Sequence, residues 1–323
     1  MPLYQLVEPL DAVDPTMVVA FDTWVDAGAA ATTAVEELVT DSRVVARFDP
    51  DALFDYRARR PPLEIRDGRL SELTWPELTV RHATIGDRDL LAFCGPEPDY
   101  RWREFAESVA ELAETLGVAE WISVGAIPAA VPHTRAVPII GTASGSAVLT
   151  SGVNRGPDGI LRVPSAAISV LEMRVAEAGI PALGYFAQIP HYVSGPYPAA
   201  ALELLGVLSR HLGVELPTGE LEEESRQLRQ RLDLAAAADE STRSYVERLE
   251  SMVDEARLPA GDELISEIER FLRQQGSQGD LPNYRHATAR ERRGHAMTGQ
   301  CNAPGSRAIV SRLSRCVTRV FSP

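Results

Sequence analysis

The segment from Met17 to Gly28 constrains the fold more than any other part of the sequence. It begins with five consecutive apolar residues, turns at Asp22, and continues as an alanine-rich stretch. An unbroken apolar run is typical of a strand covered on both faces, and a helix entered directly from such a strand forms the first half of a βαβ unit. Open α/β sheets bind their ligands at the carboxyl ends of these strands. We therefore expect Asp22, Trp24 and Asp26 to lie at a site.

The first two hundred residues alternate between strand and helix patterns. Apolar runs predict strands, and apolar residues spaced three and four apart predict helices. Predicted strands lie at residues 44–48, 78–83, 89–94, 121–124, 137–140 and 181–187, and a hairpin loop lies at 84–88. Predicted helices lie at 29–38, 102–116, 164–178 and 198–212; Pro164 opens the third, and Gly117, Gly179 and Gly213 end the last three. This order predicts a three-layer α/β sandwich with a mainly parallel sheet and an antiparallel edge.

The composition divides the chain into three parts. We expect an α/β core domain over residues 1–216 and a helical extension over 217–276, in which Asp239 and Asp262 cap two of three helices. Residues 277–323 form a basic tail with eight arginines and two acidic residues, and we expect this tail to be disordered. An alternative for part of this tail is a short helix with an apolar stripe from Ile309 to Val320, which would contact an anionic membrane or nucleic acid.

Composition excludes several kinds of chemistry. All 32 basic residues are arginine, so Schiff-base formation, pyridoxal phosphate attachment and a P-loop lysine are excluded. The net charge is −14, and the acidic core disfavours nucleic-acid binding. Three cysteines do not form a disulfide framework, and no residues have metal-ligand spacing. We expect a cytoplasmic protein with no cofactor, no metal and no membrane span.

Two loops have a similar sequence. Val131–Arg135 follows one predicted strand and Ile189–Tyr192 follows another, and each places a histidine directly after a proline. Proline restrains the backbone that presents the imidazole. On the predicted fold these loops share one crevice with the turn at Asp22. Its candidate catalytic residues are His133, His191, Asp22 and Asp26, and its candidate ligand-binding residues are Trp24, Thr134, Arg135, Tyr192 and Tyr197.

Three interpretations of this crevice stay open. It is a small-molecule or hydrolytic site in which His133 or His191 acts as acid and base and Arg135 holds an anion. Alternatively, the two histidines bind backbone carbonyls and fix the loops, or the loops form a protein-binding surface. A glycine- and serine-rich segment at Gly141–Ser146 suits either an anion cradle or a simple turn, of which we favour the turn.

The order of these segments resembles the proteasome assembly chaperone family, second-subunit type, in its actinobacterial branch. The resemblance covers residues 15–275 and is carried by Val18–Leu38 (VVAFDTWVDAGAAATTAVEEL), Gly125–Arg135 (GAIPAAVPHTR), Val163–Arg174 (VPSAAISVLEMR), Gly184–Pro198 (GYFAQIPHYVSGPYP) and Leu212–Leu221 (LGVELPTGEL). It implies a fold similar to nucleoside phosphorylases, a helical C-terminal extension, and a homo-oligomer or a pair with a related subunit.

The resemblance also implies a chaperone or scaffold role. We therefore expect a binding or scaffold protein whose precise role is unknown, and we favour this over an enzyme. A proteasome-linked protein is a candidate partner. The alternative is a phosphorylase-like or hydrolytic enzyme that acts on a small anionic substrate. Family members that dock onto proteasomes often end in a hydrophobic residue, tyrosine and any residue. This sequence ends in Phe321-Ser322-Pro323, so we do not expect its tail to enter a proteasome pocket.

Overall fold

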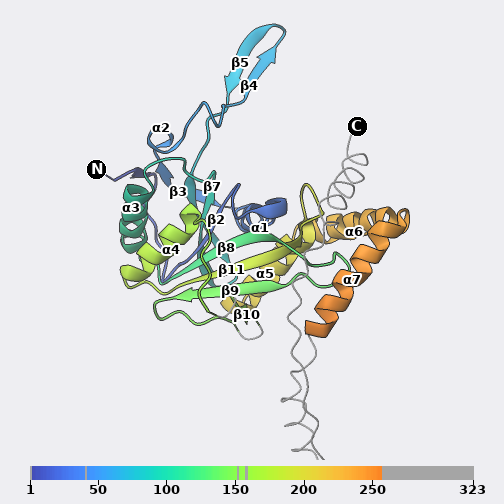
Figure 1. Ribbon diagram of the computed structural model, residues 1–323. Coiled ribbons are helices and arrows are strands. Elements are labelled where there is room, and N and C mark those ends of the chain that lie inside the picture. Colours follow the sequence, from blue (N-terminus) through green and yellow to red (C-terminus); the bar gives the residue numbers. More distant parts are fainter. Residues whose placement is uncertain (1, 41, 151–152, 157–158, 257–323) are drawn as a thin grey trace, which may run out of the picture.

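A nine-stranded sheet forms the centre of the molecule (Figure 1). The computed structural model describes residues 2–40, 42–150, 153–156 and 159–256. The strand order is β1-β3-β6-β7-β2-β8-β11-β9-β10. The strands are β1 (Tyr4–Leu6), β2 (Thr16–Phe21), β3 (Arg43–Phe48), β6 (Thr79–Ile85), β7 (Arg88–Gly95), β8 (Glu120–Ala129), β9 (Ile139–Ser144), β10 (Asn154–Arg155) and β11 (Ala182–Pro190).

The sheet is mixed, which corrects the prediction of a mainly parallel sheet. Strands β7, β2, β8 and β11 run parallel at the centre. Strands β9 and β10 are also parallel, whereas the pairs β1–β3, β3–β6, β6–β7 and β11–β9 are antiparallel. Among the described residues, the nine-stranded sheet thus has four parallel and four antiparallel pairs. The physical reason is visible at the turn between Ile85 and Arg88, which pair directly with each other. A parallel pair needs a long crossover, whereas such a tight hairpin joins antiparallel strands.

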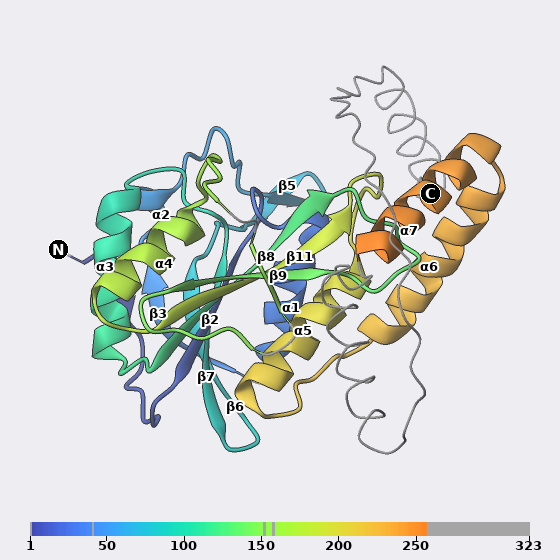
Figure 2. The same ribbon diagram turned by 60° about the horizontal axis from the view of Figure 1, so that its bottom comes forward.

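Helices cover both faces of the sheet and make three layers, as predicted. Successive residues of β2 point to opposite faces: Val18 and Ala20 pack in one apolar cluster, and Val19 and Phe21 pack in the other. The first cluster includes α1 (Ala30–Leu38, preceded by the short turn η1, Ala27–Ala29) and α5 (Pro198–Leu212). The second includes α3 (Trp102–Thr115), α4 (Ala167–Glu177) and the short α2 (Pro50–Leu53). Figure 2 shows α3 and α4 on one side of the sheet and α1 and α5 on the other. The likeness to nucleoside phosphorylases stays a prediction.

Two local predictions were wrong because tertiary contacts decided the outcome. Helix α4 begins at Ala167 instead of Pro164, and the Oε1 atom of Glu97 accepts the backbone N–H of Ala167 at 2.7 Å. This distant carboxylate sets the start of the helix. Most of the Gly141–Ser146 segment is strand β9 instead of a turn. Its hydroxyl groups at residues 142 and 144 donate to the buried carboxylate of Glu172.

Two C-terminal helices follow the α/β body and confirm part of the predicted extension. Helices α6 (Leu221–Ala237) and α7 (Glu240–Ala256) form a hairpin at the edge of the body (Figure 1). The apolar stripe of α6 joins the same cluster as α1 and α5, and Leu249 of α7 packs on Tyr192. The predicted helix near Asp262 and the basic tail lie outside the described residues, and the predicted domain boundaries stay predictions. No helix in the described ranges has both the length and the hydropathy needed to cross a membrane.

A two-stranded arm that was not predicted projects from the body (Figure 1). Strands β4 (Leu63–Arg66) and β5 (Arg69–Leu73) pair only with each other and form a separate sheet. The turn between them consists of Asp67 and Gly68, with φ angles of 50° and 75°. Positive φ at both central residues is the geometry that a tight hairpin requires. At the base of the arm, the N–H of Thr74 donates to the carbonyl of Pro62 at 3.0 Å.

Candidate functional site

The candidate residues leave the sheet at one rim. Strands β2, β8 and β11 are parallel neighbours, so the turn at Asp22 and the loops that follow β8 and β11 all begin at the carboxyl ends of adjacent strands. Their positions follow from the buried apolar runs that form these strands. The side chains in the three segments nevertheless go to different partners.

Asp22 forms an ion pair at its own end of the rim. Its two carboxylate oxygens lie 2.9 and 3.3 Å from the guanidinium of Arg59, and its Oδ1 accepts the backbone N–H of Glu97 at 3.1 Å. Asp22 lines a cavity of about 410 Å³ together with Arg81 and Cys94. Trp24, two residues later in the chain, is 59% exposed. Neither Asp22 nor Trp24 lines the separate cavity, described below, whose wall includes His133.

Asp26 caps helix α1. Its Oδ1 accepts the backbone N–H of Ala31 at 2.7 Å and that of Thr32 at 3.3 Å, and its Oδ2 accepts the Thr32 hydroxyl. Burial raises the pKa of Asp26, and these hydrogen bonds oppose the rise. The adjacent Gly28 has a φ of +64°, and a Cβ at this position would lie 2.9 Å from Cβ of Tyr197. The turn thus packs closely on the start of α5, where the N–H of Tyr197 donates to the carbonyl of Gly28 at 2.9 Å.

His133 is buried and bound to Tyr192. The hydroxyl oxygen of Tyr192 accepts the backbone N–H of His133 at 2.8 Å and lies 2.7 Å from its Nδ1. On the other side of the ring, Nε2 lies 3.3 Å from Oδ1 of Asp233, in an alignment that does not make a hydrogen bond. Burial lowers the pKa of His133, and the Asp233 carboxylate opposes this effect. His133 is therefore held as a neutral imidazole at neutral pH.

His191 binds groups on two other elements. Its Nδ1 lies 2.9 Å from the carbonyl oxygen of Ala129, and its Nε2 lies 3.0 Å from the hydroxyl of Tyr245 on α7. The carbonyl can only accept, so Nδ1 carries a proton and donates to it. Both ring nitrogens are thus used inside the molecule. This is the arrangement that loop fixation requires.

Thr134 and Arg135 bind the helical hairpin. The Thr134 hydroxyl donates to the Glu250 carboxylate. The Arg135 guanidinium donates to Glu250 at 3.1 Å and to both carboxylate oxygens of Asp254 at 3.0 and 2.8 Å. In the opposite direction, the Arg229 side chain of α6 donates to the backbone carbonyl of His133 at 2.9 Å. Polar contacts in both directions therefore hold the loop after β8 against α6 and α7.

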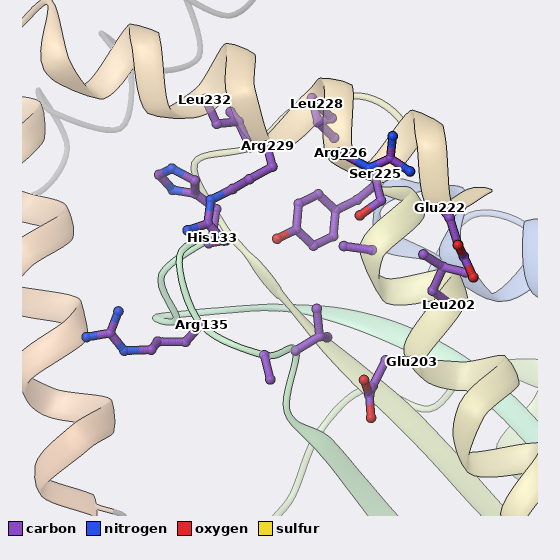
Figure 3. Close-up of a pocket in the computed structure, with 14 residues that line it drawn as sticks. His133, Arg135, Leu202, Glu203, Glu222, Ser225, Arg226, Leu228, Arg229 and Leu232 are labelled. Atoms are coloured by element: carbon purple, nitrogen blue, oxygen red, sulfur yellow. The ribbon is translucent and has the colours of Figure 1, made fainter. Parts of the chain in front are cut away.

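A cavity of about 480 Å³ lies between this loop, α5 and α6. Figure 3 shows Leu228, Arg229 and Leu232 on α6 above the cavity and Leu202 and Glu203 on α5 beside it, whereas Arg135 points toward the neighbouring helix. The lining also includes His133, Arg135, Val137, Tyr197, Glu222, Ser225 and Arg226.

The structure thus brings together only part of the predicted crevice. His133, Arg135 and Tyr197 line one cavity, and Asp22 lines another. Asp26 caps a helix, and His191 and Tyr192 make internal hydrogen bonds. The residues of α6 that line the cavity were not predicted from the sequence as site residues. The pattern that could have indicated them is Leu228 and Leu232, four residues apart on a charged helix, with Arg229 beside them. In the described ranges, no group of three or more acidic, histidine or cysteine side chains is arranged to hold a metal.

Comparisons with known proteins agree with this architecture. The model of the PAC2 family matches residues 20–236. A protein of unknown function from Corynebacterium glutamicum is 31% identical, with a TM-score of 0.72, over 78% of this chain and 97% of that one. A protein of unknown function from Mycobacterium tuberculosis is 30% identical, with a TM-score of 0.71, over 84% and 92% of the two chains.

A third solved structure belongs to a relative of proteasome-assembly chaperones. The proteasome-assembly chaperone homologue of Mycobacterium tuberculosis is 33% identical, with a TM-score of 0.65, over 72% of this chain and 99% of that one. Among curated proteins, none matches the chain.

Proposed function

Because the chain belongs to the PAC2 family, we propose that it is a binding or scaffold protein that acts through protein–protein contacts and assembles with further copies of itself. The observation that carries this proposal is the exposed apolar face of the β4–β5 arm. Leu63 pairs with Leu73 and Ile65 pairs with Leu70 across the two strands, so the four side chains share one face. Their exposed fractions are 48%, 42%, 60% and 73%.

An isolated two-stranded hairpin is marginally stable in water, and an exposed apolar face adds a further cost. The arm therefore gains most from a surface that covers this face. A groove that fits such a role lies next to the base of the arm, lined by Phe48, Pro50, Tyr56 and Trp75, with a volume of about 390 Å³. Trp75 is 47% exposed and stacks edge-on against Tyr56 at a centroid distance of 4.8 Å. The face of the arm is aliphatic, and the groove combines aromatic residues, which are enriched in interface cores, with Arg47, Asp51 and Glu77.

We propose a second copy of this chain as the occupant, because every copy carries both the exposed apolar face and the groove at the base of the arm. The arm itself, residues 63–73, has two arginines and three acidic residues, so the contact depends on its apolar face and not on charge. If each copy gives one arm and receives one, every protomer buries both its arm and its groove. This doubling brings the buried area closer to the roughly 800 Å² per partner that stable interfaces use.

The candidate catalytic residues support a scaffold more than an enzyme. Asp26 is used as a helix cap, His191 has both ring nitrogens bound internally, and Asp22 is paired with Arg59. An acid–base site needs such groups free to reach a substrate. A related protein is described as a proteasome-assembly chaperone homologue, so a proteasome-linked protein is the heterologous partner that we propose to test first.

The test is sedimentation velocity over a series of protein concentrations. We expect the wild type to associate, and a variant with Leu63→Ser, Ile65→Ser and Leu70→Ser to sediment as a monomer. A matched control replaces three exposed apolar residues elsewhere (Leu161→Ser, Val163→Ser and Leu234→Ser), and this control should associate like the wild type. A wild type that stays monomeric, or an arm variant that associates with unchanged affinity, would remove the proposal.

A further inference from the structure

The wall of the cavity beneath α6 includes two polar aromatic side chains, His133 and Tyr197. The side chain of His133 is 2% exposed, and its Nε2 lies 3.3 Å from Oδ1 of Asp233. The Tyr192 hydroxyl accepts the backbone N–H of His133, and its own proton is then directed to Nδ1 of the ring. A neutral imidazole that accepts at Nδ1 carries its proton on Nε2. This N–H faces the Asp233 carboxylate and has almost no exposed surface, so His133 closes the cavity wall without offering a donor to a ligand.

The hydroxyl of Tyr197 is the polar group that the cavity wall does offer. This residue is 4% exposed and lines the same cavity, and its hydroxyl makes no hydrogen bond within the described part of the chain. Burial raises the pKa of Tyr197 to about 12, so the hydroxyl keeps its proton at neutral pH. A protonated hydroxyl on the cavity wall, with no partner among the described residues, is a donor that is available to a ligand.

The arginines of the lining are already paired. Arg135 binds Glu250 and Asp254, Arg226 binds Glu223, and Arg229 binds Asp233 and two backbone carbonyls. Among the described lining residues, no cation is left over for an anionic ligand. The remaining wall is largely apolar and includes Val137, Leu202, Leu228 and Leu232. This chemistry disfavours a phosphate or carboxylate and favours a neutral molecule with an apolar body.

We propose that this cavity binds an uncharged, mainly apolar small molecule that has a carbonyl-type acceptor. The acceptor receives a hydrogen bond from the hydroxyl of Tyr197, and the apolar body packs against the leucines of α5 and α6. A volume of about 480 Å³ suits a molecule of this kind. The inference goes beyond the scaffold role and does not depend on self-assembly.

The experiment uses Prodan, 6-propionyl-2-(dimethylamino)naphthalene, as the probe. Prodan is neutral and largely apolar, it has one ketone acceptor, and its emission shifts to shorter wavelength in apolar surroundings. Titration of the full chain should give saturable binding of one probe per chain with this shift. The anionic dye 1-anilinonaphthalene-8-sulfonate should bind at least tenfold more weakly, because the lining offers no unpaired cation.

Three variants locate the probe. Tyr197→Phe removes only the hydroxyl and should weaken Prodan binding about five- to tenfold. Leu202→Trp fills the cavity from α5 and should abolish binding. Leu234→Trp adds the same indole on the exposed side of α6 and should leave binding unchanged. Thermal unfolding confirms that each variant is folded.

The proposal is overturned if Prodan does not bind saturably, or if Leu202→Trp binds it as well as Leu234→Trp does. It is also overturned if Tyr197→Phe binds Prodan with unchanged affinity, or if the anionic dye binds more tightly than Prodan. Self-assembly is measured without the probe, so these outcomes leave the scaffold proposal to its own test.

Discussion

The hydroxyl oxygen of Tyr192 lies 2.8 Å from the backbone nitrogen of His133 and 2.7 Å from its Nδ1, so one side chain fixes both the main chain and the ring of the opposite loop. The two residues belong to the two loops with similar sequences, which leave β8 and β11 side by side. Tyr192 is almost fully buried and also packs against Leu249 of α7. The side chain of Tyr192 therefore connects both loops with α7.

Replacing Tyr192 with phenylalanine tests this connection. The change removes the hydroxyl and leaves the buried N–H of His133 without an acceptor, so we expect the free energy of unfolding to fall by about 1–3 kcal/mol. Denaturant unfolding measures this loss. Tyr56→Phe is the control, because its hydroxyl binds Asp51 at the surface and should matter by less than about 0.5 kcal/mol. Equal losses in the two variants would contradict the role of Tyr192.

The pH dependence of stability tests the neutral state of His133. Burial lowers its pKa in the folded protein below the ordinary value of 6.5, so below pH 6.5 the unfolded chain binds this proton more readily than the folded chain. The stability that the neutral ring contributes is present above pH 6.5 and is lost as the pH falls toward the folded pKa, with a slope of up to about 1.4 kcal/mol per pH unit.

His133→Gln removes this titration. As the pH falls below 6.5, we expect the unfolding free energy of the wild type to decrease relative to that of His133→Gln. An NMR titration of the His133 ring in the wild type provides a second measurement. A difference that moves in the opposite direction on acidification, or a ring that titrates above pH 6.5, would show that His133 is charged in the folded protein.

The ion pairs of Arg135 should control the local opening of α7. These pairs are partly exposed, so their loss should change global stability by less than about 1 kcal/mol. Arg135→Met removes them while keeping an apolar stem. We expect the amides of α7 to exchange with deuterium about fivefold faster in this variant, because the helix opens more often from the loop.

Arg243→Met is the matched control. The partners of Arg243, Glu240 and Glu247, lie on α7 itself, so its loss does not detach the helix from the body. Exchange that is equally fast in both variants would mean that Arg135 does not hold α7.

Much of the α/β body was predictable because its signals are local. The apolar runs at Met17–Phe21 and Trp121–Val124 are typical of covered strands, and apolar spacing of three and four indicated α3. The direction of each strand was harder to predict, because it depends on which strands become neighbours. The arm had a clear signal in Asp67-Gly68 between two short alternating runs, a pattern typical of a tight hairpin.

The site was less predictable because its partners are far apart in the sequence. The proline–histidine loops pointed to the correct rim of the sheet, but not to the hydrogen bond between Tyr192 and His133. Arg135 suits an anion clamp by residue type, and only the fold places Glu250 and Asp254, more than one hundred residues later, against its guanidinium. Asp26 likewise suits acid–base chemistry until its contacts with the first turn of α1 are seen.

The most direct test of the account is the oligomeric state of a chain from which the arm has been removed. The hydrogen bond between Thr74 and Pro62 brings the two ends of the arm together, so two glycines can replace residues 63–73 without moving the body. We expect the wild type to form a defined assembly in native mass spectrometry, and the armless chain to be a monomer with the thermal unfolding of an intact body. An armless chain that forms the same assembly would contradict the central claim that the arm joins one copy to the next.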